Sequence, residues 1–182
     1  MTTQSNMAIV GIIDDDTIHK VSSIWSEFRD TFGVKGFSNI PYPHISLQVA
    51  QHYEVDQLES SLRTTARQLS RIELYTGGLG IFTGKAPVVH VAVARTTQFD
   101  NLQEQMHSIC RQWAKNPDEH YNPDRWIPHI TLAQGQIVND QIPQMIRMLQ
   151  HRDLQWTIHI EALAVMRYSQ DKPQKTFPFK GV

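Results

Sequence analysis

The sequence predicts a protein of mixed α and β structure in which one order of elements, β-α-β-α-β, occurs twice. Strand-like and helix-like hydrophobic patterns alternate in this order along the 182 residues. A pentapeptide also recurs at the same place in both passes, because residues 43–47 read Pro-His-Ile-Ser-Leu and residues 128–132 read Pro-His-Ile-Thr-Leu. We therefore expect one domain over residues 1–182, built from two pseudo-symmetric repeats at about 7–82 and 88–168.

The first pass places two helices among strand-like segments. An apolar run at residues 7–13 ends at three aspartates, which is typical of a buried strand followed by a helix N-cap. Val21, Ile24 and Phe28 lie three and four residues apart, which predicts a helix over 16–32 with Gly33 at its C-cap. The other expected elements are an extended segment over 44–50, a helix over 56–70, a strand over 72–75 and an apolar stretch over 79–82.

The second pass follows a linker at residues 83–87 that contains glycine and proline. Leu102, Met106 and Trp113 share one face of a predicted helix over 99–114, and residues 116–125 form a loop rich in Asn, Asp and Pro. The other expected elements are a strand over 88–94, an extended segment over 129–133, a helix over 140–149 and one or two strands over 156–168.

Charge and cysteine content narrow the class of protein. The chain has 17 Lys and Arg against 18 Asp and Glu, which argues against a protein that grips long nucleic acids but allows a small anionic substrate. Its one cysteine, Cys110, cannot form an intramolecular disulfide, and we expect it to be a small buried apolar residue. The first apolar run is too short for a membrane span and has no basic flank. We expect a cytoplasmic monomer with no membrane partner.

The repeated pentapeptide places a histidine and a hydroxyl on the same face of a strand in each copy. Side chains alternate along a strand, so His44 and Ser46 share one face, and so do His129 and Thr131. The isoleucine and leucine of each copy point to the opposite face, where they anchor the strand in a core. If the repeats pack about a pseudo-twofold axis, two imidazoles and two hydroxyls meet across a cleft.

Such a set of side chains suits acid–base attack on a phosphodiester. Histidine has an ordinary pKa of about 6.5, so one imidazole can accept a proton while the other donates one. The hydroxyls can donate hydrogen bonds to the phosphate oxygens as charge develops on them, and no metal is required. The alternative is that both histidines are structural, in which case replacing either would change stability without a specific catalytic defect.

These paired motifs resemble those of the 2H phosphoesterase superfamily, whose two signatures read His-x-(Ser/Thr)-hydrophobic. The glycine-rich stretch at residues 78–82 and Trp126, three residues before His129, are similar to the branch of 2′-5′ RNA ligase-like cyclic phosphodiesterases. The resemblance implies a bilobal α+β fold with antiparallel sheets lining a central cleft and helices outside.

The resemblance also implies an activity and its residues. It implies hydrolysis, without metal or cofactor, of the 2′,3′-cyclic phosphate of an RNA 3′ end or a small cyclic nucleotide, giving a 2′-phosphate. His44 and His129 match the catalytic positions of the family, and Ser46 and Thr131 match its phosphate-binding hydroxyls. We expect His129 to activate water and His44 to protonate the leaving oxygen. The alternatives are a 2′-5′ phosphodiesterase or ligase-like activity on oligonucleotides, and a non-catalytic module that binds nucleotides or RNA ends.

Other side chains near the signatures are weaker candidates. Tyr42, Tyr121 and Trp126 can stack on a base, although packing is an equal alternative for Trp126. His90 and His159 lie in strand-like runs and can approach the cleft, although an ordinary surface or core histidine is the favoured alternative for each. No histidine spacing indicates a zinc site. The candidate cations for contact with phosphate are Lys35, Lys85, Arg125 and Arg167, and the alternative for each is a solvated surface charge.

Overall fold

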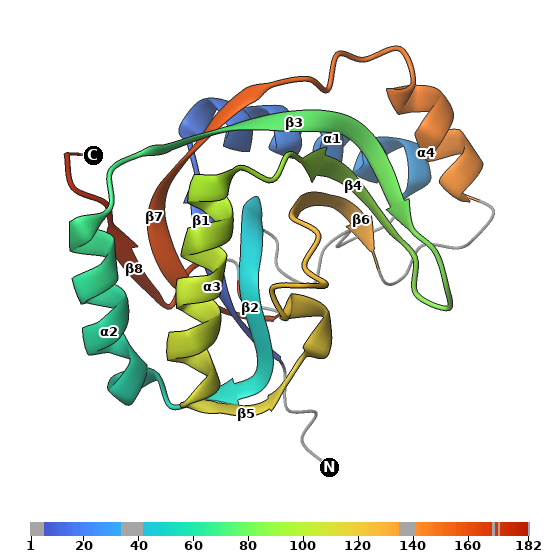
Figure 1. Ribbon diagram of the computed structural model, residues 1–182. Helices are drawn as coiled ribbons and strands as arrows, with labels where there is room; N and C mark the ends of the chain where they lie inside the picture. The colour runs from blue at the N-terminus through green and yellow to red at the C-terminus, as the bar shows by residue number, and fades with distance from the viewer. Residues whose placement is uncertain (1–5, 34–41, 135–140, 169, 171, 182) are drawn as a thin grey trace.

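The computed structural model describes residues 6–33, 42–134, 141–168, 170 and 172–181, and within these residues the chain has α+β structure (Figure 1). Its elements in chain order are β1 (Met7–Ile13), α1 (Asp15–Phe32), β2 (His44–Tyr53), α2 (Val55–Gln68), β3 (Ile72–Phe82), β4 (Val88–Val93), α3 (Thr97–Arg111), β5 (Ala114–Pro117), the 3-10 helix η1 (Glu119–Tyr121), β6 (His129–Gln134), α4 (Ile142–Leu149), β7 (Thr157–Arg167) and β8 (Lys175–Pro178). The strands form one antiparallel sheet in the order β5-β2-β1-β7-β3-β4-β6, with β8 beside β7. The predicted fold class is confirmed.

Local sequence signals set the ends of the first helix. The Asp14 carboxylate accepts a hydrogen bond from the backbone N–H of Thr17, which caps α1 at its N-terminus. Gly33 has a φ of 66°, the left-handed conformation that ends a helix with least strain in glycine. Both caps stand where the sequence predicts them.

Several sequence-based boundaries were wrong. The two segments expected at 72–75 and 79–82 are one strand, β3, which is irregular between Thr76 and Leu79 in its pairing with β4. The predicted loop over 116–125 begins inside β5, and the helix expected to reach residue 114 ends at Arg111. β8 was not expected. Residue 140, the expected start of α4, lies outside the described residues.

The last strand of each pass crosses into the other half of the sheet. β7 pairs with β1, and the second part of β3 pairs with β4, while β3 and β7 also pair with each other through residues 72–75 and 157–160. In the order β2-β1-β7-β3-β4-β6, each strand of the first pass therefore has a counterpart at the same distance from the opposite end. The counterpart of β1 is β4, that of β2 is β6 and that of β3 is β7. A duplication would produce this order, and the division into two repeats within one domain remains our proposal.

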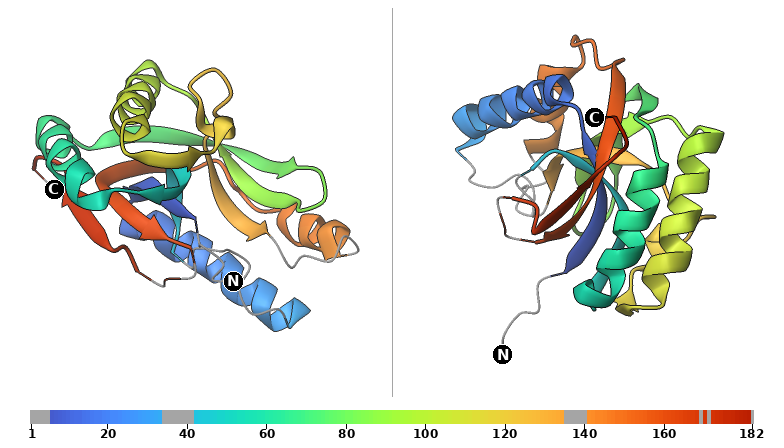
Figure 2. Two further views of the ribbon diagram at one scale, coloured as in Figure 1. Left: turned by 90° about the horizontal axis from the view of Figure 1, so that it is seen from below. Right: turned by 90° about the vertical axis from the view of Figure 1, so that its left-hand side faces the viewer.

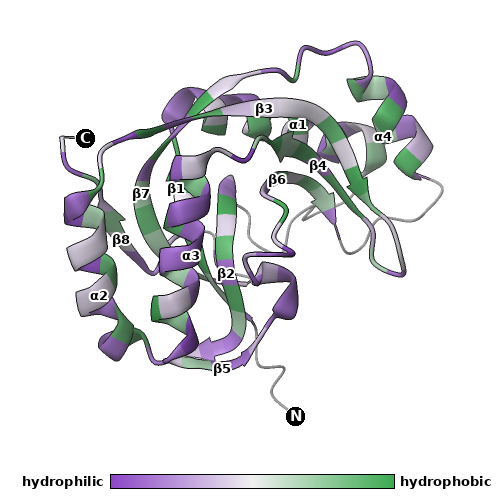
Figure 3. Cartoon of the chain, viewed as in Figure 1, coloured by the Kyte–Doolittle hydropathy of each residue, from purple (hydrophilic) through white to green (hydrophobic). Residues whose placement is uncertain are grey.

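The helices lie outside the sheet in two groups (Figure 2). α2 and α3 lie side by side, with α3 against β2 and α2 against β7 and β8, whereas α1 contacts β6 at the other end of the sheet. Figure 3 shows that α2 and α3 carry both hydrophobic and hydrophilic residues, whereas β7 is mostly hydrophobic. The main hydrophobic cluster joins residues of both passes, including Phe28, Phe99 and Cys110, which is 1% exposed as expected.

None of the helices in the described ranges is both long and apolar enough to cross a membrane.

The consequence of the fold for the site is that β2 and β6, which carry the two pentapeptides, contact each other although they lie near opposite ends of the strand order.

Candidate active site

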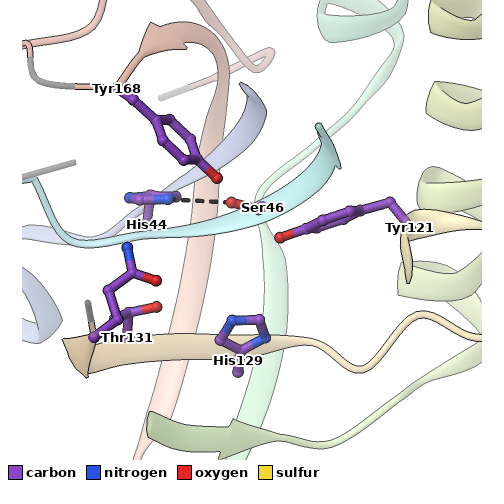
Figure 4. A pocket seen from close by; sticks show the side chains of 7 residues that line it. His44, Ser46, Tyr121, His129, Thr131 and Tyr168 are labelled. Carbon is purple, nitrogen blue, oxygen red and sulfur yellow. Dashed lines mark hydrogen bonds between the residues drawn. The ribbon is translucent and has the colours of Figure 1, made fainter. Parts of the chain in front are cut away.

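The two signature strands bring the predicted histidines and hydroxyls into one cavity. His44, Ser46, His129 and Thr131 all line it, as Figure 4 shows. The isoleucine and leucine of each signature are 0% exposed in the core on the opposite face. The alternation predicted from the sequence is therefore present in both strands.

Each signature strand has an irregularity directly after its hydroxyl residue. Ser46 pairs with Val10 but Gln48 pairs with Ile9, so that Leu47 is an extra residue in β2. In the same way Thr131 pairs with His90 but Ala133 pairs with Val89, so that Leu132 is the extra residue in β6. A bulge of this kind bends a strand and redirects its side chains, and here it occurs at matching places beside the site.

The two histidines are held in the same tautomer. Nδ1 of His44 lies 2.6 Å from the carbonyl oxygen of Tyr42, and Nδ1 of His129 lies 2.8 Å from that of Ile127. Because a carbonyl only accepts, each Nδ1 carries the proton and the neutral ring leaves Nε2 as an acceptor. Nε2 of His44 lies 3.2 Å from Oγ of Ser46, so the hydroxyl donates to it. Both rings therefore offer a basic nitrogen to the cavity.

Burial keeps both imidazoles neutral in the free protein. It lowers the pKa of His44 to about 4, with a smaller contribution from the positive charge that His129 would carry. Burial also lowers the pKa of His129. An anionic phosphate between the rings favours the protonated form and opposes this effect, so substrate binding promotes the uptake from water of the proton that an acid catalyst needs.

Two tyrosines complete the cavity wall. The Tyr121 hydroxyl hydrogen bonds with the Ser46 side chain, and burial raises the pKa of this phenol. Burial raises the pKa of Tyr168 to about 12, so both phenols remain protonated donors near neutral pH. Tyr168 was not expected from the sequence, and only the pairing of β7 with β1 brings it to the site.

The cavity is small and a larger groove continues from it. The cavity measures about 30 Å³ and also includes Gln134 in its wall. The groove measures about 800 Å³ and shares Tyr121, His129 and Gln134 with the cavity, but His44 does not line it. Access to the two histidines is therefore unequal.

Comparison with protein families matches residues 15–172 to the 2′-5′ RNA ligase superfamily. The chain belongs to this superfamily. The membership confirms the predicted relationship to the 2H phosphoesterases.

Curated relatives agree with the superfamily. A protein of Bacillus thuringiensis (strain Al Hakam) and one of Bacillus cereus (strain AH187), both named "Putative phosphoesterase", are 30% identical over 100 residues, which cover 51% of this chain and 52% of each relative. The chain thus spans about half the length of the curated relatives it matches.

Solved structures with low sequence identity to this chain share its fold. The crystal structure of TT0787 of Thermus thermophilus superposes with a TM-score of 0.64 at 15% identity, covering 97% of this chain and 98% of that one. The crystal structure of E. coli LigT complexed with 3′-AMP gives 0.55 at 11% identity, again covering 97% and 98%. These similarities support the bilobal antiparallel architecture expected of the superfamily.

Of the predicted stacking residues, only Tyr121 lines the cavity. Trp126 is 2% exposed and packs edge to face on Phe99 at 4.9 Å, and it also lines the groove. Tyr42 contributes its carbonyl to His44 and packs in a small cluster with Val10 and other apolar residues. Stacking on a base remains a prediction for all three.

The predicted cations are scattered. Arg125 lines the groove, whereas Lys85 and Arg167 line neither the cavity nor the groove. Lys35 lies outside the described residues.

Of the two weaker histidine candidates, only His90 reaches the site. The His90 ring stacks on Phe82 at 4.2 Å and lies 5.1 Å from the His129 ring. His159 instead lies 3.7 Å from the Asp14 carboxylate and 3.6 Å from that of Glu73. Among the described residues, no three His, Cys, Asp or Glu side chains gather as metal ligands would.

Proposed function

We propose that this protein is a metal-independent phosphodiesterase that hydrolyses 2′,3′-cyclic phosphates of RNA ends or nucleotides to 2′-phosphates. One observation carries the proposal: two imidazole Nε2 atoms and two hydroxyls, supplied by separate strands, line a single small cavity. Acid–base hydrolysis of a phosphodiester needs a proton acceptor and a proton donor on opposite sides of the phosphorus. Membership of the superfamily and the phosphoesterase names of its relatives support an activity of this class.

The proposed reaction uses each of these groups once. The non-bridging oxygens accept hydrogen bonds from Ser46 and Thr131, and these bonds strengthen as negative charge develops. One imidazole removes a proton from water, and the water oxygen forms a new bond to phosphorus. The bond between phosphorus and the ribose 3′ oxygen breaks, and the other imidazole, as imidazolium, protonates that oxygen. The product keeps its phosphate on the 2′ oxygen.

The unequal access favours one assignment of roles. The nucleoside is much larger than water, and only His129 lies in the wall of the 800 Å³ groove. The leaving oxygen belongs to the nucleoside, so we propose that His129 is the acid and His44 the base. Burial lowers the pKa of His44 to about 4, which suits a residue that must be neutral. This assignment is the reverse of the one expected from the sequence.

A leaving group that departs without protonation tests the assignment. With bis(4-nitrophenyl) phosphate, His129→Ala should retain most of the wild-type rate, because no acid is required, whereas His44→Ala should lose it. The opposite pattern would restore the assignment expected from the sequence. Equal losses in both variants would contradict a division into acid and base.

A panel of substrates tests the activity itself. The panel contains 2′,3′-cyclic nucleotides, RNA with a cyclic end and 2′-5′ dinucleotides, and both binding and product formation are measured. We expect turnover of the cyclic phosphates to 2′-phosphates. Faster cleavage of 2′-5′ dinucleotides would favour the alternative phosphodiesterase, and binding without turnover would favour a non-catalytic module.

Chelation tests the role of metal. We expect the hydrolysis rate to be unchanged in EDTA, because every proposed proton transfer and phosphate contact uses a protein side chain. A rate abolished by EDTA and restored by a divalent cation would contradict the mechanism.

A further inference from the structure

Two tryptophans each donate an indole N–H to the backbone of a phosphate-binding hydroxyl residue. Nε1 of Trp126 lies 2.9 Å from the carbonyl oxygen of Ser46, and Nε1 of Trp25 lies 3.2 Å from the carbonyl oxygen of Thr131. These residues are separated by 80 and 106 positions in the sequence. Neither bond is a consequence of local structure, and both end at the same residue of the two signatures.

The two carbonyls lie where each signature strand has an open edge. β6 is the last strand of the sheet order, so β4 is its one strand neighbour among the described residues. β2 has a second neighbour, β5, but this pairing involves Ala50, His52 and Tyr53 and does not reach Ser46. Open edges leave backbone groups without strand partners, and the indole group is a donor only, so it suits an unpaired carbonyl.

The donors come from the opposite half of the chain in each case. Trp25 is in α1 of the first pass and contacts β6 of the second, whereas Trp126 precedes β6 and contacts β2 of the first. Trp126 is 2% exposed, and Arg95 fixes its segment by donating to the Trp126 carbonyl at 3.3 Å and to the Pro123 carbonyl at 3.3 Å. Each half of the molecule therefore holds the hydroxyl residue of the other.

We propose that Trp25 and Trp126 are positioning residues that act through Thr131 and Ser46, respectively. Each indole fixes a backbone carbonyl directly after the Cα that carries the hydroxyl, so it limits the movement of that hydroxyl relative to the bound phosphate. A displacement of about 1 Å in such a group is enough to slow a reaction by about 10²-fold. The inference rests on the proposed function for its kinetic readout.

Phenylalanine substitutions remove the donor and keep an aromatic ring. We expect Trp126→Phe and Trp25→Phe each to lower kcat about tenfold, the effect of losing one hydrogen bond worth about 1.4 kcal/mol. KM should change less, because the hydroxyl contacts strengthen in the transition state. Trp156→Phe is the matched control. The Trp156 indole donates a hydrogen bond of 2.9 Å to the Asp153 carbonyl, and neither residue lines the cavity. An equal effect in all three variants would overturn the proposal.

A crossed set of double variants separates positioning from general loss of structure. In a Ser46→Ala background Trp126→Phe should lose most of its effect, while Trp25→Phe keeps it. In a Thr131→Ala background the pattern should reverse. A general loss of folded protein predicts that each tryptophan substitution lowers the rate by the same factor in both backgrounds, because it reduces the amount of active enzyme whichever hydroxyl is present. That result would overturn the proposal.

Two further measurements cover failure of folding or of the proposed activity. If a phenylalanine variant does not fold, 3-benzothienylalanine at the same position keeps the shape of indole without its N–H. If the wild type turns over no substrate on the panel, inorganic phosphate is titrated while the indole N–H signals are followed by NMR. Shifts at Trp25 and Trp126 but not Trp156 would support the proposal independently of turnover. Phosphate binding with no shift at either indole would overturn it.

Discussion

The two halves of the site share their reacting groups but differ in the strands beneath them. Beside Ser46, the next two strands place Val10 and then Ala164. At the matching positions beside Thr131 they place His90 and then Gly80. We call these neighbouring residues the floor of each half: Val10 and Ala164 beside Ser46, and His90 and Gly80 beside Thr131. The floor is apolar on the His44 side, whereas on the His129 side it contains a third imidazole. Similar backbones thus give the two signature histidines different surroundings.

The floor of the second half depends on a glycine. The His90 ring lies across Gly80, where an added Cβ would stand 2.3 Å from its Nε2. Phe82 stacks on His90 and meets the His129 ring edge to face at 4.9 Å. His129 is therefore packed by rings and opens onto the groove, whereas His44 is hydrogen-bonded to Ser46 in the small cavity. This comparison teaches that two matching signatures can keep the same histidine and hydroxyl positions while the side chains around them differ.

The largest expected effect comes from removing the imidazoles. His44→Ala and His129→Ala should each lower turnover by about 10²- to 10⁴-fold with folding intact, the usual range for acid–base groups. The double variant should be little slower than the slower single variant, because the two groups act as a unit. Steady-state kinetics with circular dichroism as a folding control measures both. Multiplicative losses would indicate two independent roles.

Removing the hydroxyls of Ser46 and Thr131 should reveal the difference between the two halves of the site. Ser46→Ala and Thr131→Ala should each lower kcat by about 10²-fold, as removal of one transition-state donor does. Ser46→Ala also removes the hydroxyl at 3.2 Å from Nε2 of His44, so it alone should shift the pH dependence of kcat/KM. The same shift in both variants would contradict the difference between the halves.

A single methyl group tests the packing of His90. Gly80→Ala should lower the free energy of unfolding by about 1–3 kcal/mol, because the new Cβ displaces the ring. Gly77→Ala in the same strand is the control, since its Cβ would lie 3.9 Å from that of Ala92, and it should change stability by less than about 0.5 kcal/mol. Urea denaturation measures both variants. Equal stabilities would show that His90 is not held against Gly80.

The dependence of stability on pH should change gradually and report specifically on the buried histidines. His90 is 3% exposed, and burial lowers its pKa from 6.5 to about 4. Between these values the unfolded chain binds a proton that the folded protein does not, so stability falls as pH decreases. One such histidine contributes up to about 1.4 kcal/mol per pH unit.

The matched substitution for that test is His90→Val, the residue type at the corresponding place in the first half. The variant should lose stability less steeply than the wild type between pH 6.5 and about 4, while the contribution of His44 remains. Urea denaturation at several pH values gives the slopes. Identical slopes would mean that His90 is not buried in its neutral form.

The sequence predicted the parts of the fold and site that depend on local pattern. The caps of α1 and the alternation of His44 and Ser46 against apolar neighbours follow from local geometry, and the structure agrees. β5 has the composition of a loop, Ala-Lys-Asn-Pro, and is a strand because it pairs with β2. The exchange of β3 and β7 between the halves likewise has no local signal.

The remaining parts of the site required the tertiary structure. Tyr168 reaches the cavity because β7 pairs with β1, and no motif marks it. Trp126 lies close to a signature in sequence, which suggested a surface for stacking, but its role as a donor to Ser46 depends on a contact across 80 residues. Pairing and packing over long sequence distances decide such roles.

The most direct test of the central claim follows 2′,3′-cyclic AMP through a single reaction in ¹⁸O-labelled water without added metal. Phosphorus NMR and mass spectrometry identify the product formed by the wild type and by the double variant His44→Ala/His129→Ala. We expect the wild type to give a 2′-phosphate with one ¹⁸O atom and the folded double variant to give essentially none. Hydrolysis by the double variant at the wild-type rate would contradict the account.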